Sequence, residues 1–551
     1  MADSLSAPIH YPFNPAGLIN NPHKIMLGRI DFALRRCFNR TCQRICFLLF
    51  IGKTSAIPTS HSQIANTKAR FMHKNFIAGE WVDSESAIQN INPSDTNDII
   101  GEYAQATSVQ LESAIQAAIA ARKACREMSL EARQAALMFI GNELLARQDE
   151  LGELLAREEG KTLAEGIGEV NRSGKHFIFY AAEVLRQMGQ TADSVRAGIE
   201  IDVRHEPMGV VAVISPWNFP MAIPAWKIGP ALAYGNAVLF KPANLTPGSA
   251  HALMGIISRS GLPDNAVQLL MGSGGKIGDA LARDPRVDAV TFTGSLEVGK
   301  QVAVATASHL GKYQLELGSK NALLVMDDAN LDAAAAAAIA GAYFGTGQKC
   351  TCSSRLIVHS AVHDQFVDLM KTKMAAIKIG HALDEGVNIG PCVSAGQLAA
   401  NLDWIEKAKI EGADIAVGGG TVECRTPGHY MAPTLLTNTT NDMSFNREEM
   451  FAPTAAVIKV DSYDEGLATA NDTHYGLSAG IFTQSLARAT HFRRHIETGV
   501  VTINLPTGGM DYHVPFGGRK MSSSGPREQG SAAMEFFTQM KTSYTLAGAP
   551  E

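Results

Sequence analysis

The stretch that decides the fold is VVAVISPWNFPMAIPAWKIGPALAYGNAVLFK, residues 210–241. It begins with an unbroken apolar run, Val210–Ile214, continues through a segment of helical length and ends in a second apolar run, Ala237–Phe240. Continuous apolar runs of this length are typical of strands that are buried on both faces of a sheet. A strand, a helix and a second strand in this order predict an α/β protein with a parallel sheet.

The same alternation continues towards the C-terminus. Three further apolar runs follow, with helical stretches between them: Val267–Met271, Ala289–Phe292 and Ala322–Val325. Because ligands bind beyond the carboxyl ends of parallel strands, functional residues should come directly after each run. Candidates stand at the ends of four runs: Asn218, Lys241, Gly272 and the pair Gly294-Ser295.

The C-terminal part of the chain repeats this pattern. Its strand-like runs are Arg355–His359, Ala455–Val460, Leu477–Phe482 and Val500–Asn504. They predict a second α/β domain, and a chain of 551 residues is too long for one hydrophobic core. Upstream of residue 210, the apolar spacing predicts helices over 109–159 and 160–186, and residues 199–205 alternate like an exposed strand.

A second informative stretch, YFGTGQKCTC at residues 343–352, contains Cys350. This cysteine follows an alanine-rich helical run, Leu331–Phe344, and two glycines. A cysteine reacts as the thiolate, so a nucleophile needs helix ends, amide groups or a base that lower its pKa, and glycines that leave room for substrate. The alternative is that Cys350 is one more small buried apolar side chain.

Four motifs in a fixed order connect these features. They are Pro216-Trp217-Asn218-Phe219-Pro220, Leu315-Glu316-Leu317-Gly318-x-Lys320-Asn321, Gly347-Gln348-x-Cys350 and Glu448-Glu449-x-Phe451. The set resembles the signatures of the aldehyde dehydrogenase family, and the resemblance extends from about residue 75 to residue 544. Within that family, NLPTGGMDYHVPFGGRK (504–520) and the following SSSGPREQG are most similar to the 2-oxoglutarate semialdehyde (2,5-dioxopentanoate) dehydrogenases.

The resemblance implies an aldehyde dehydrogenase-like α/β fold with two parallel-sheet domains and a small oligomerisation hairpin. Residues 75–188 and 207–318 would form a dinucleotide-binding domain, and 319–520 a catalytic domain. Residues 189–206 and 533–547 would be oligomerisation elements, which implies a homodimer or homotetramer.

The first 71 residues differ from the rest of the chain in being basic and poor in acidic residues. Such segments are found in transit peptides, but no cleavage site is evident. We interpret residues 1–71 as a disordered or non-native N-terminal extension, because Met72 directly precedes the point where the family resemblance begins.

The resemblance also assigns catalytic roles. Cys350 would add to the aldehyde as a thiohemiacetal that is oxidised to a thioester, and the Asn218 amide would stabilise the oxyanion of the adduct. Glu316 would be the general base that activates water, which favours a free acid as the product. Taken alone, Asn218 could be a turn residue and Glu316 a surface charge. Lys241 is also among the catalytic candidates.

The cofactor implied by the resemblance is NADP or NAD. Gly272-x-Gly274-x-x-x-Gly278 and Phe292-Thr293-Gly294-Ser295-x-x-x-Gly299 resemble the cofactor loops of the family. The other expected cofactor residues are Pro216, Trp217, Lys241, Asn244, Glu449 and Phe451. Asn244 stands where many NAD-preferring members carry a glutamate, and a neutral side chain removes repulsion towards the 2′-phosphate of NADP.

Two positions depart from the family pattern. Ser319 lies in the motif that contains Glu316, and Ala452 directly follows the motif Glu448-Glu449-x-Phe451; glycine is usual at both positions. Their Cβ atoms would clash if the backbone there required positive φ.

The implied substrate is a small anionic aldehyde, so a cation should line its site. Arg172 is our candidate because arginine binds carboxylates in bidentate fashion, although it could equally be a helix-surface residue. Thr507, within Leu505-Pro506-Thr507-Gly508, would shape the pocket. We expect oxidation of 2,5-dioxopentanoate to 2-oxoglutarate, with succinate semialdehyde as the alternative substrate. Other readings are a cofactor-free thioester hydrolase and a non-enzymatic binding protein.

Composition argues against several other classes of function. The net charge of −6 provides no basic field for nucleic acid, and the apolar run Ile45–Ile51 is too short to cross a membrane. The cysteines are scattered, with no second pair at zinc-like spacing beside Cys350-x-Cys352, so no metal site is expected. A working thiolate fits a reducing compartment, and we expect a cytoplasmic protein.

Overall fold

The computed structural model describes residues 72–548, and the interpretation of residues 1–71 lies outside that range. Its first large sheet has eight strands in the order β20-β12-β11-β8-β9-β10-β2-β3. The parallel strands of this sheet are β8 (Val210–Ile214), β9 (Ala237–Lys241), β10 (Val267–Leu269), β11 (Ala289–Thr293) and β12 (Lys312–Glu316). The edges are antiparallel: β20 (Ser523–Ser524), β2 (Asn75–Ile77) and β3 (Glu80–Val82).

The second large sheet has seven strands in the order β15-β16-β17-β14-β13-β18-β19. Its strands are β13 (Asn321–Val325), β14 (Ser353–His359), β15 (Asp414–Val417), β16 (Thr434–Thr439), β17 (Thr454–Val460), β18 (Ser478–Phe482) and β19 (Val500–Ile503). All neighbouring pairs are parallel except β15 with β16. The predicted α/β class with two parallel sheets is therefore confirmed.

One strand lies in a different sheet from the one that the alternation suggested. The run Ala322–Val325 seemed to continue the first sheet, but β13 belongs to the second sheet and the fifth parallel strand of the first is β12. Only residues 317–320 connect these two strands. A parallel neighbour in the same sheet needs a crossover of roughly a dozen residues or more, so the short connection sends β13 into the other sheet.

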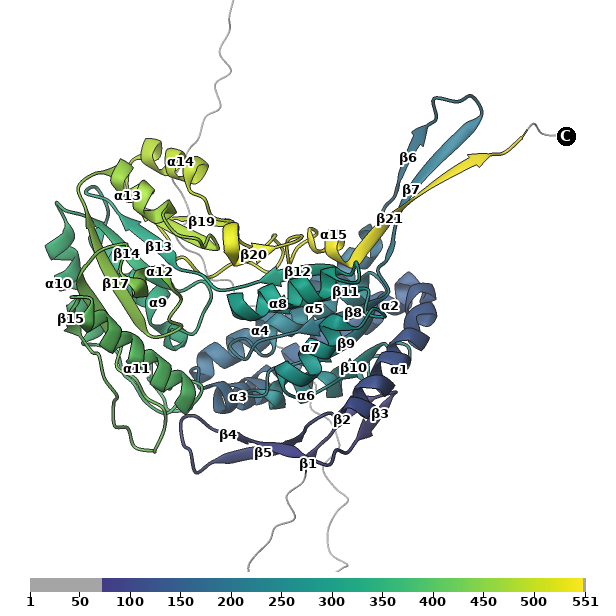
Figure 1. The fold of residues 1–551 in the computed structure, drawn as a ribbon, viewed down its shortest axis with the longest axis horizontal. Helices are drawn as coiled ribbons and strands as arrows, with labels where there is room; N and C mark the ends of the chain where they lie inside the picture. Colours follow the sequence, from purple (N-terminus) through teal and green to yellow (C-terminus); the bar gives the residue numbers. More distant parts are fainter. Residues whose placement is uncertain (1–71, 549–551) are drawn as a thin grey trace, which may run out of the picture. The chain divides into compact units, whose positions relative to one another are not determined.

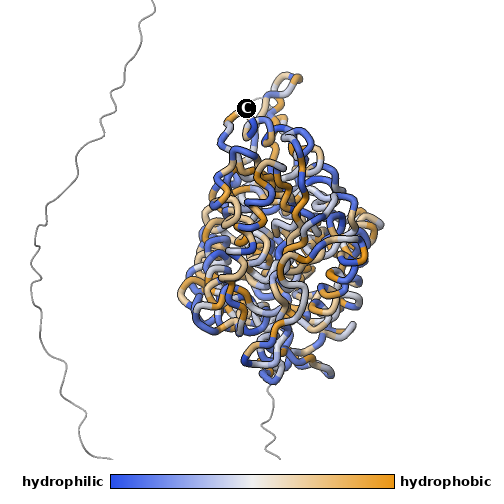
Figure 2. Tube along the Cα trace, turned by 90° about the vertical axis from the view of Figure 1, so that its left-hand side faces the viewer, coloured by the Kyte–Doolittle hydropathy of each residue, from blue (hydrophilic) through white to orange (hydrophobic). Residues whose placement is uncertain are grey.

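Helices cover both large sheets (Figure 1). Those associated with the first half of the chain are α1 (Ser108–Glu127), α2 (Leu130–Ala146), α3 (Gln148–Glu159), α4 (Leu163–Glu183), α5 (Ala222–Ala233), α6 (Pro247–Ile257), α7 (Asp279–Arg283) and α8 (Leu296–Ala307). The remainder are α9 (Leu331–Ala342), α10 (His363–Met374), α11 (Ala395–Ile410), α12 (Ser444–Arg447), α13 (Tyr463–Asn471), α14 (Leu486–His495) and α15 (Ala533–Phe537). The trace in Figure 2 alternates between apolar and polar stretches, as amphipathic helices packed on buried strands require.

The helical stretch predicted over 109–159 is three helices, and the break before α4 is set by local chemistry. Gly160 has φ +97°, a left-handed conformation that ends α3. Thr162 then begins α4 with a capping box. Its hydroxyl accepts from the Glu165 N–H, and the Glu165 carboxylate accepts from the Thr162 N–H.

Two smaller sheets complete the fold. One contains β1 (Met72–His73), β5 (Ile99–Ala104) and β4 (Ala87–Ile91). The other is antiparallel, in the order β21-β7-β6, with β6 (Gln190–Asp193), β7 (Ile199–Pro207) and β21 (Thr538–Leu546). It extends beyond the helices in Figure 1, and all of β21 except Thr538 is exposed.

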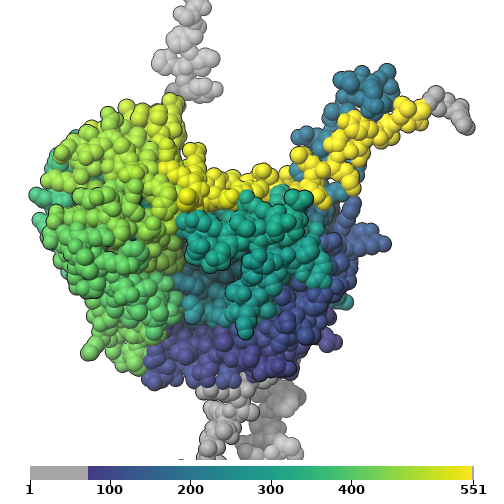
Figure 3. Space-filling view, viewed as in Figure 1, coloured from purple at the N-terminus to yellow at the C-terminus, as the bar shows by residue number. Residues whose placement is uncertain are grey.

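The C-terminal segment contacts both halves of the chain. Strand β20 pairs with β12 in the first sheet, while the Gly518 region contacts the turn before β18. In Figure 3 the yellow C-terminal residues lie where the teal and green parts of the chain meet. Among residues 72–548, no helix is long and apolar enough to cross a membrane.

Candidate active site

Cys350 lies in a sharp turn that follows α9. Residues 345–347 all have φ between +55° and +65°, so the chain leaves the helix through three successive left-handed residues. At Gly347 a Cβ would stand 2.0 Å from the carbonyl oxygen of Ala452, so only glycine fits. The Asn321 amide, at the start of β13, donates to the Cys350 carbonyl at 2.8 Å and ties the turn to the second sheet.

The turn opens onto a cavity of about 380 Å³. Its wall includes Cys350, Arg172 on α4 and Trp226 on α5, together with Pro506 and Gly508. A volume in this range is typical of small-molecule sites. The structure therefore brings the candidate nucleophile and the candidate substrate cation to one cavity.

The surroundings of Cys350 hold its thiol in the neutral form. Burial, and then the nearby carboxyl groups of Glu449 and Glu316, raise the pKa of Cys350 well above the usual thiol range. A thiol in such surroundings becomes a nucleophile only when a base takes its proton.

Asn218 follows β8 and reaches the cysteine turn from the first sheet. Its side-chain amide donates to the Gln348 carbonyl at 3.1 Å, two residues before Cys350. The Gln348 side chain accepts from the Val393 N–H at 2.9 Å, which holds the turn from its other side.

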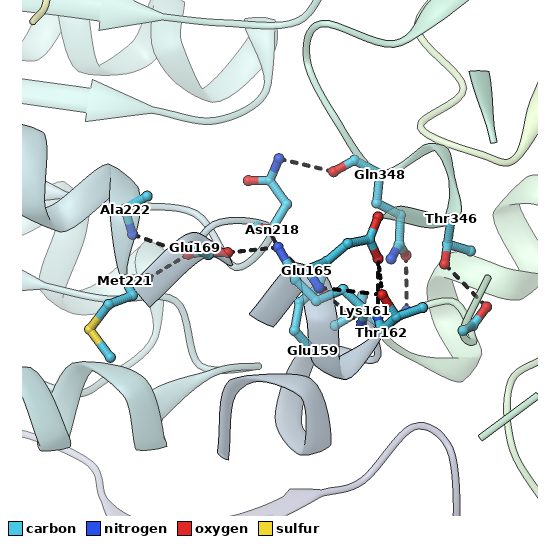
Figure 4. Close-up of polar contacts among 12 residues, drawn as sticks. Glu159, Lys161, Thr162, Glu165, Glu169, Asn218, Met221, Ala222, Thr346 and Gln348 are labelled. Carbon is cyan, nitrogen blue, oxygen red and sulfur yellow. Dashed lines mark hydrogen bonds and ion pairs between the residues drawn. The ribbon is translucent and has the colours of Figure 1, made fainter. Parts of the chain in front are cut away.

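A buried ion pair fixes the turn that carries Asn218 (Figure 4). The Lys161 ammonium donates to Glu169 and to the Asn218 carbonyl, both at 2.7 Å, and lies 4.1 Å from the centre of the Phe219 ring. The other Glu169 oxygen accepts the N–H groups of residues 221 and 222, which begin α5. This pair therefore links α4, the Asn218 turn and the start of α5.

The sequence reasoning did not identify Lys161. Its partners lie 8 and 57 residues away in the chain, so no local spacing connects them. The available signal was the capping box of Thr162 and Glu165, which marks a helix start and places the preceding Lys161 on the connection between two helices.

Glu316 ends β12 and is 4% exposed. One carboxyl oxygen accepts from the Ser523 hydroxyl at 2.7 Å, and the other lies 2.7 Å from where a Cβ on Gly517 would stand. Burial, and then the charge of Glu528, raise the pKa of Glu316 well above its usual value. A raised pKa makes the ionised carboxylate of Glu316 a stronger base, which suits a general base.

Lys241 ends β9 at the carboxyl edge of the first sheet, where burial lowers its pKa to about 8. No acidic side chain within residues 72–548 forms an ion pair with it. Its ammonium lies 4.0 Å from where a Cβ on Gly274 would stand, in the turn Gly274–Gly278. A buried cation that faces a glycine turn without an acidic partner fits a ligand rich in oxygen atoms, such as a dinucleotide.

The other glycine candidates make close approaches to side chains. A Cβ on Gly272 would stand 2.7 Å from Ile277, and one on Gly294 would stand 2.5 Å from the Phe292 ring. Gly278 ends the turn Gly274–Gly278, and Ser295 stands at the N-cap position of α8 without a side-chain capping bond.

Asn244 lies near the same edge. Its amide donates to the Gln105 side chain at 3.2 Å. Gln105 follows β5, far away in the sequence, and it was not among the expected residues.

Glu449 and Phe451 line a second, smaller pocket at the Cys350 turn. The Glu449 carboxyl accepts from the Ser319 N–H at 2.9 Å, and burial raises its pKa to about 7. Phe451 has φ +57° and packs edge to face on Trp217, with 5.4 Å between the ring centres. Trp217 follows Pro216 after β8, so this contact joins the two motifs.

The two departures from glycine cause no backbone strain. Neither Ser319 nor Ala452 has positive φ. The Ser319 hydroxyl hydrogen-bonds with the Asn321 side chain, and Ala452 packs in a buried apolar cluster with Phe445. In this part of the chain it is Phe451, and not Ala452, that adopts the left-handed conformation.

The two expected substrate residues lie in different surroundings. Arg172 is not a surface residue: it lines the cavity, with its guanidinium 6.0 Å from the centre of the Trp226 ring. Thr507 is fully buried behind the wall, where its hydroxyl donates to the Thr351 carbonyl at 2.8 Å and bonds to Ser353 at 2.6 Å. Neither Thr507 nor Glu316 lines the cavity.

Comparison with known proteins places this site in a family. The aldehyde dehydrogenase family model matches residues 81–543. The chain is 43% identical to the alpha-ketoglutaric semialdehyde dehydrogenase of Bacillus subtilis, over 85% of this chain and 97% of that protein. It is 36% identical to the 2,5-dioxopentanoate dehydrogenase of Saccharolobus solfataricus, over 85% of this chain and 98% of that protein.

Solved structures agree with these relatives. A betaine aldehyde dehydrogenase from Staphylococcus aureus in complex with NAD+ is 30% identical, has a TM-score of 0.84 and covers 87% of this chain and 96% of its own. An NADP-dependent enzyme from E. coli is 34% identical, has a TM-score of 0.83 and covers 86% of this chain and 98% of its own. The chain belongs to the aldehyde dehydrogenase family.

Proposed function

We propose that this protein oxidises 2,5-dioxopentanoate to 2-oxoglutarate with NAD or NADP as the oxidant. The choice of substrate rests on the position of Arg172. This cation lines the cavity of Cys350 and forms no ion pair with an acidic side chain of residues 72–548. An arginine so placed favours a short aldehyde that ends in a carboxylate. The names of the Bacillus and Saccharolobus relatives support the same substrate.

The reaction begins with removal of the Cys350 proton. Glu316, whose carboxylate is made more basic by burial, is the proposed base. The thiolate adds to the aldehyde carbon, and the Asn218 amide, which donates to Gln348 in the structure, then donates to the oxyanion of the thiohemiacetal. Glu316 passes this proton to solvent and, once the adduct is oxidised to a thioester, takes a proton from water. The resulting hydroxide attacks the thioester carbon, the Cys350 thiolate leaves and the free acid is released.

The cofactor residues have separate tasks. When bound at the carboxyl edge of the first sheet, NAD or NADP supplies the oxidant that takes two electrons from the adduct carbon. Lys241 and Glu449 would hold the two riboses, and Phe451 and Trp217 would pack beside the nicotinamide end. Pro216, Asn244, Gly272, Gly278, Gly294 and Ser295 would complete the site. Asn244 leaves room for the 2′-phosphate of NADP, so both cofactors are accepted.

The experiment is the absorbance of reduced nicotinamide when the full chain is mixed with 2,5-dioxopentanoate or succinate semialdehyde, with NAD and NADP in turn. We expect the highest kcat/KM with 2,5-dioxopentanoate, and no turnover by Cys350→Ala. Preference for succinate semialdehyde would keep the mechanism and overturn the substrate. Ester hydrolysis without binding of NAD or NADP would indicate a cofactor-free hydrolase.

We also propose the domain roles and the assembly. Residues 75–188 and 207–318 form the dinucleotide-binding domain, and 319–520 the catalytic domain. Residues 189–206 and 533–547 assemble a homodimer or homotetramer, because β21 exposes Met540, Tyr544 and Leu546 beside an edge that pairs with no strand of residues 72–548. Light scattering should give a mass of two or four chains. The need for a reduced Cys350 supports a cytoplasmic location.

A further inference from the structure

Arg172, the proposed substrate cation, has a polar neighbour in the cavity wall that has no role in the mechanism above, Gln529. Arg172 and Gln529 both line the cavity, and the Arg172 Nη2 lies 3.5 Å from the Gln529 side-chain oxygen, at the limit of a hydrogen bond. The Arg172 Nε and the Gln529 side-chain nitrogen are buried and have no hydrogen-bond partner within residues 72–548. Gln529 itself is 0% exposed.

Gln529 is held in place by both of its neighbours. Glu528 exchanges two backbone hydrogen bonds with Phe516, at 2.7 and 2.9 Å, and its carboxylate accepts from the Trp226 indole at 2.7 Å. On the other side, the Tyr180 hydroxyl donates to the Gly530 carbonyl at 3.3 Å. The backbone that carries Gln529 is therefore fixed on both sides of this residue.

The backbone of Gln529 is strained. Its φ is +61°, in the left-handed region that side chains other than glycine rarely adopt. Strain of this kind costs about 1–3 kcal/mol and is found where surrounding structure imposes it, often at ligand sites. Glycine would relieve the strain at this position, so packing of the backbone alone does not explain glutamine.

The two unpartnered groups suit different acceptors. A guanidinium matches a carboxylate, whereas an N–H of a neutral amide matches a neutral oxygen such as a ketone. A 2-oxo acid presents both acceptors on adjacent carbons. Succinate semialdehyde presents only the carboxylate.

We infer that Gln529 is a specificity-determining residue, which donates its amide N–H to the 2-oxo group of the substrate while Arg172 holds the neighbouring carboxylate. The inference rests on the proposed function and deepens it. It explains how the site distinguishes a 2-oxo acid from an aldehyde acid of similar charge: without the ketone, the buried amide N–H remains unpaired.

The test compares 2,5-dioxopentanoate with 5-oxopentanoate, which has the same length, aldehyde and carboxylate but no 2-oxo group. The quantity measured is the ratio of the two kcat/KM values, in the wild type and in Gln529→Gly and Gln529→Asn. We expect a wild-type ratio well above one and a fall of roughly tenfold or more in both variants. Glycine and asparagine both accept positive φ, so the variants should fold.

Leu310→Gly is the matched control. Leu310 also has positive φ, +63°, but it is 96% exposed, so this change relieves the same backbone strain away from the cavity. The control should keep the wild-type ratio.

The remaining outcomes separate the inference from the proposed function. If Gln529 only positions Arg172, both acids lose rate equally, the ratio is unchanged and the inference is overturned. A wild-type ratio near one overturns it as well. If the wild type oxidises butanal but neither acid, the proposed substrate is wrong and the inference falls with it.

Discussion

Two buried lysines lie near the two ends of the candidate site, and their surroundings differ. Lys161 is 4% exposed and its ammonium contacts Glu169 and the Asn218 carbonyl; although burial lowers its pKa, the charges of Glu159 and Glu169 outweigh that effect and raise it overall. Lys241 is 5% exposed, has no ion pair among residues 72–548, and has its pKa lowered to about 8 by burial. A buried cation with partners positions other residues, whereas one without partners suits a ligand.

The largest effect is expected from Lys161→Met. Removing one member of a buried ion pair leaves an uncompensated charge and costs about 3–5 kcal/mol of the free energy of unfolding. The urea midpoint of unfolding measures this loss.

Lys161→Met combined with Glu169→Gln is the control for that loss. It removes the stranded charge and keeps an oxygen that can accept the N–H groups of residues 221 and 222. The double variant should unfold at a higher urea concentration than Lys161→Met. If the single variant unfolds like the wild type, Lys161 does not hold this turn.

Lys241→Met should weaken cofactor binding and leave the stability of the fold intact. The folded protein loses no ion pair, so stability is kept or rises, while affinity for NAD and NADP falls by roughly 10–100-fold, or about 1.4–2.8 kcal/mol. A fluorescence titration of each cofactor measures the dissociation constant. Unchanged affinity would show that Lys241 does not contact the cofactor.

The low pKa of Lys241 predicts a pH dependence. Because its folded pKa, about 8, lies below the unfolded value of about 10.4, burial of the ammonium destabilises the fold below pH 8, and this cost disappears as the pH rises from 8 to above 10. Cofactor affinity should fall over the same range as the ammonium loses its proton. Titrations from pH 7 to 9.5 measure the effect, which should be absent in Lys241→Met.

The smallest effect is expected from Asn244→Glu. This change places a carboxylate at position 244, where many NAD-preferring members of the family carry a glutamate. The carboxylate repels a 2′-phosphate but can accept hydrogen bonds from ribose hydroxyls. The ratio of NADP to NAD affinity should fall by roughly tenfold, about 1.4 kcal/mol. Asn244→Gln, which has the same length but no charge, should leave the ratio close to that of the wild type.

Local sequence was enough for much of the fold. The apolar runs at 210–214 and 237–240 form strands, as is typical of apolar residues without alternation that are buried on both faces, and the segment between them forms α5. The sheet to which each strand belongs was harder to predict from the sequence. The alternation assigned residues 322–325 to the first sheet, but the short connection from β12 places them in the second.

The residues of the candidate site also fall into two groups, those that the sequence identifies and those that only the structure identifies. Cys350, Asn218, Glu316 and Glu449 stand in recognisable motifs, so they could be named from the sequence, and their roles remain predictions for the experiments above. Lys161 stands in none of these motifs, and Gln529 lies in SSSGPREQG without an assigned role, because what distinguishes both residues is the presence or absence of a partner in space.

The sequence by itself determined the family, the α/β class and the order of the motifs, because these depend on residue types at fixed spacings along the chain. Only the tertiary structure decided that Arg172 lines the cavity, that Thr507 lies behind its wall and that Ser319 needs no positive φ. Burial and backbone dihedral angles are set by elements that are distant in the chain. No local pattern of residues records them.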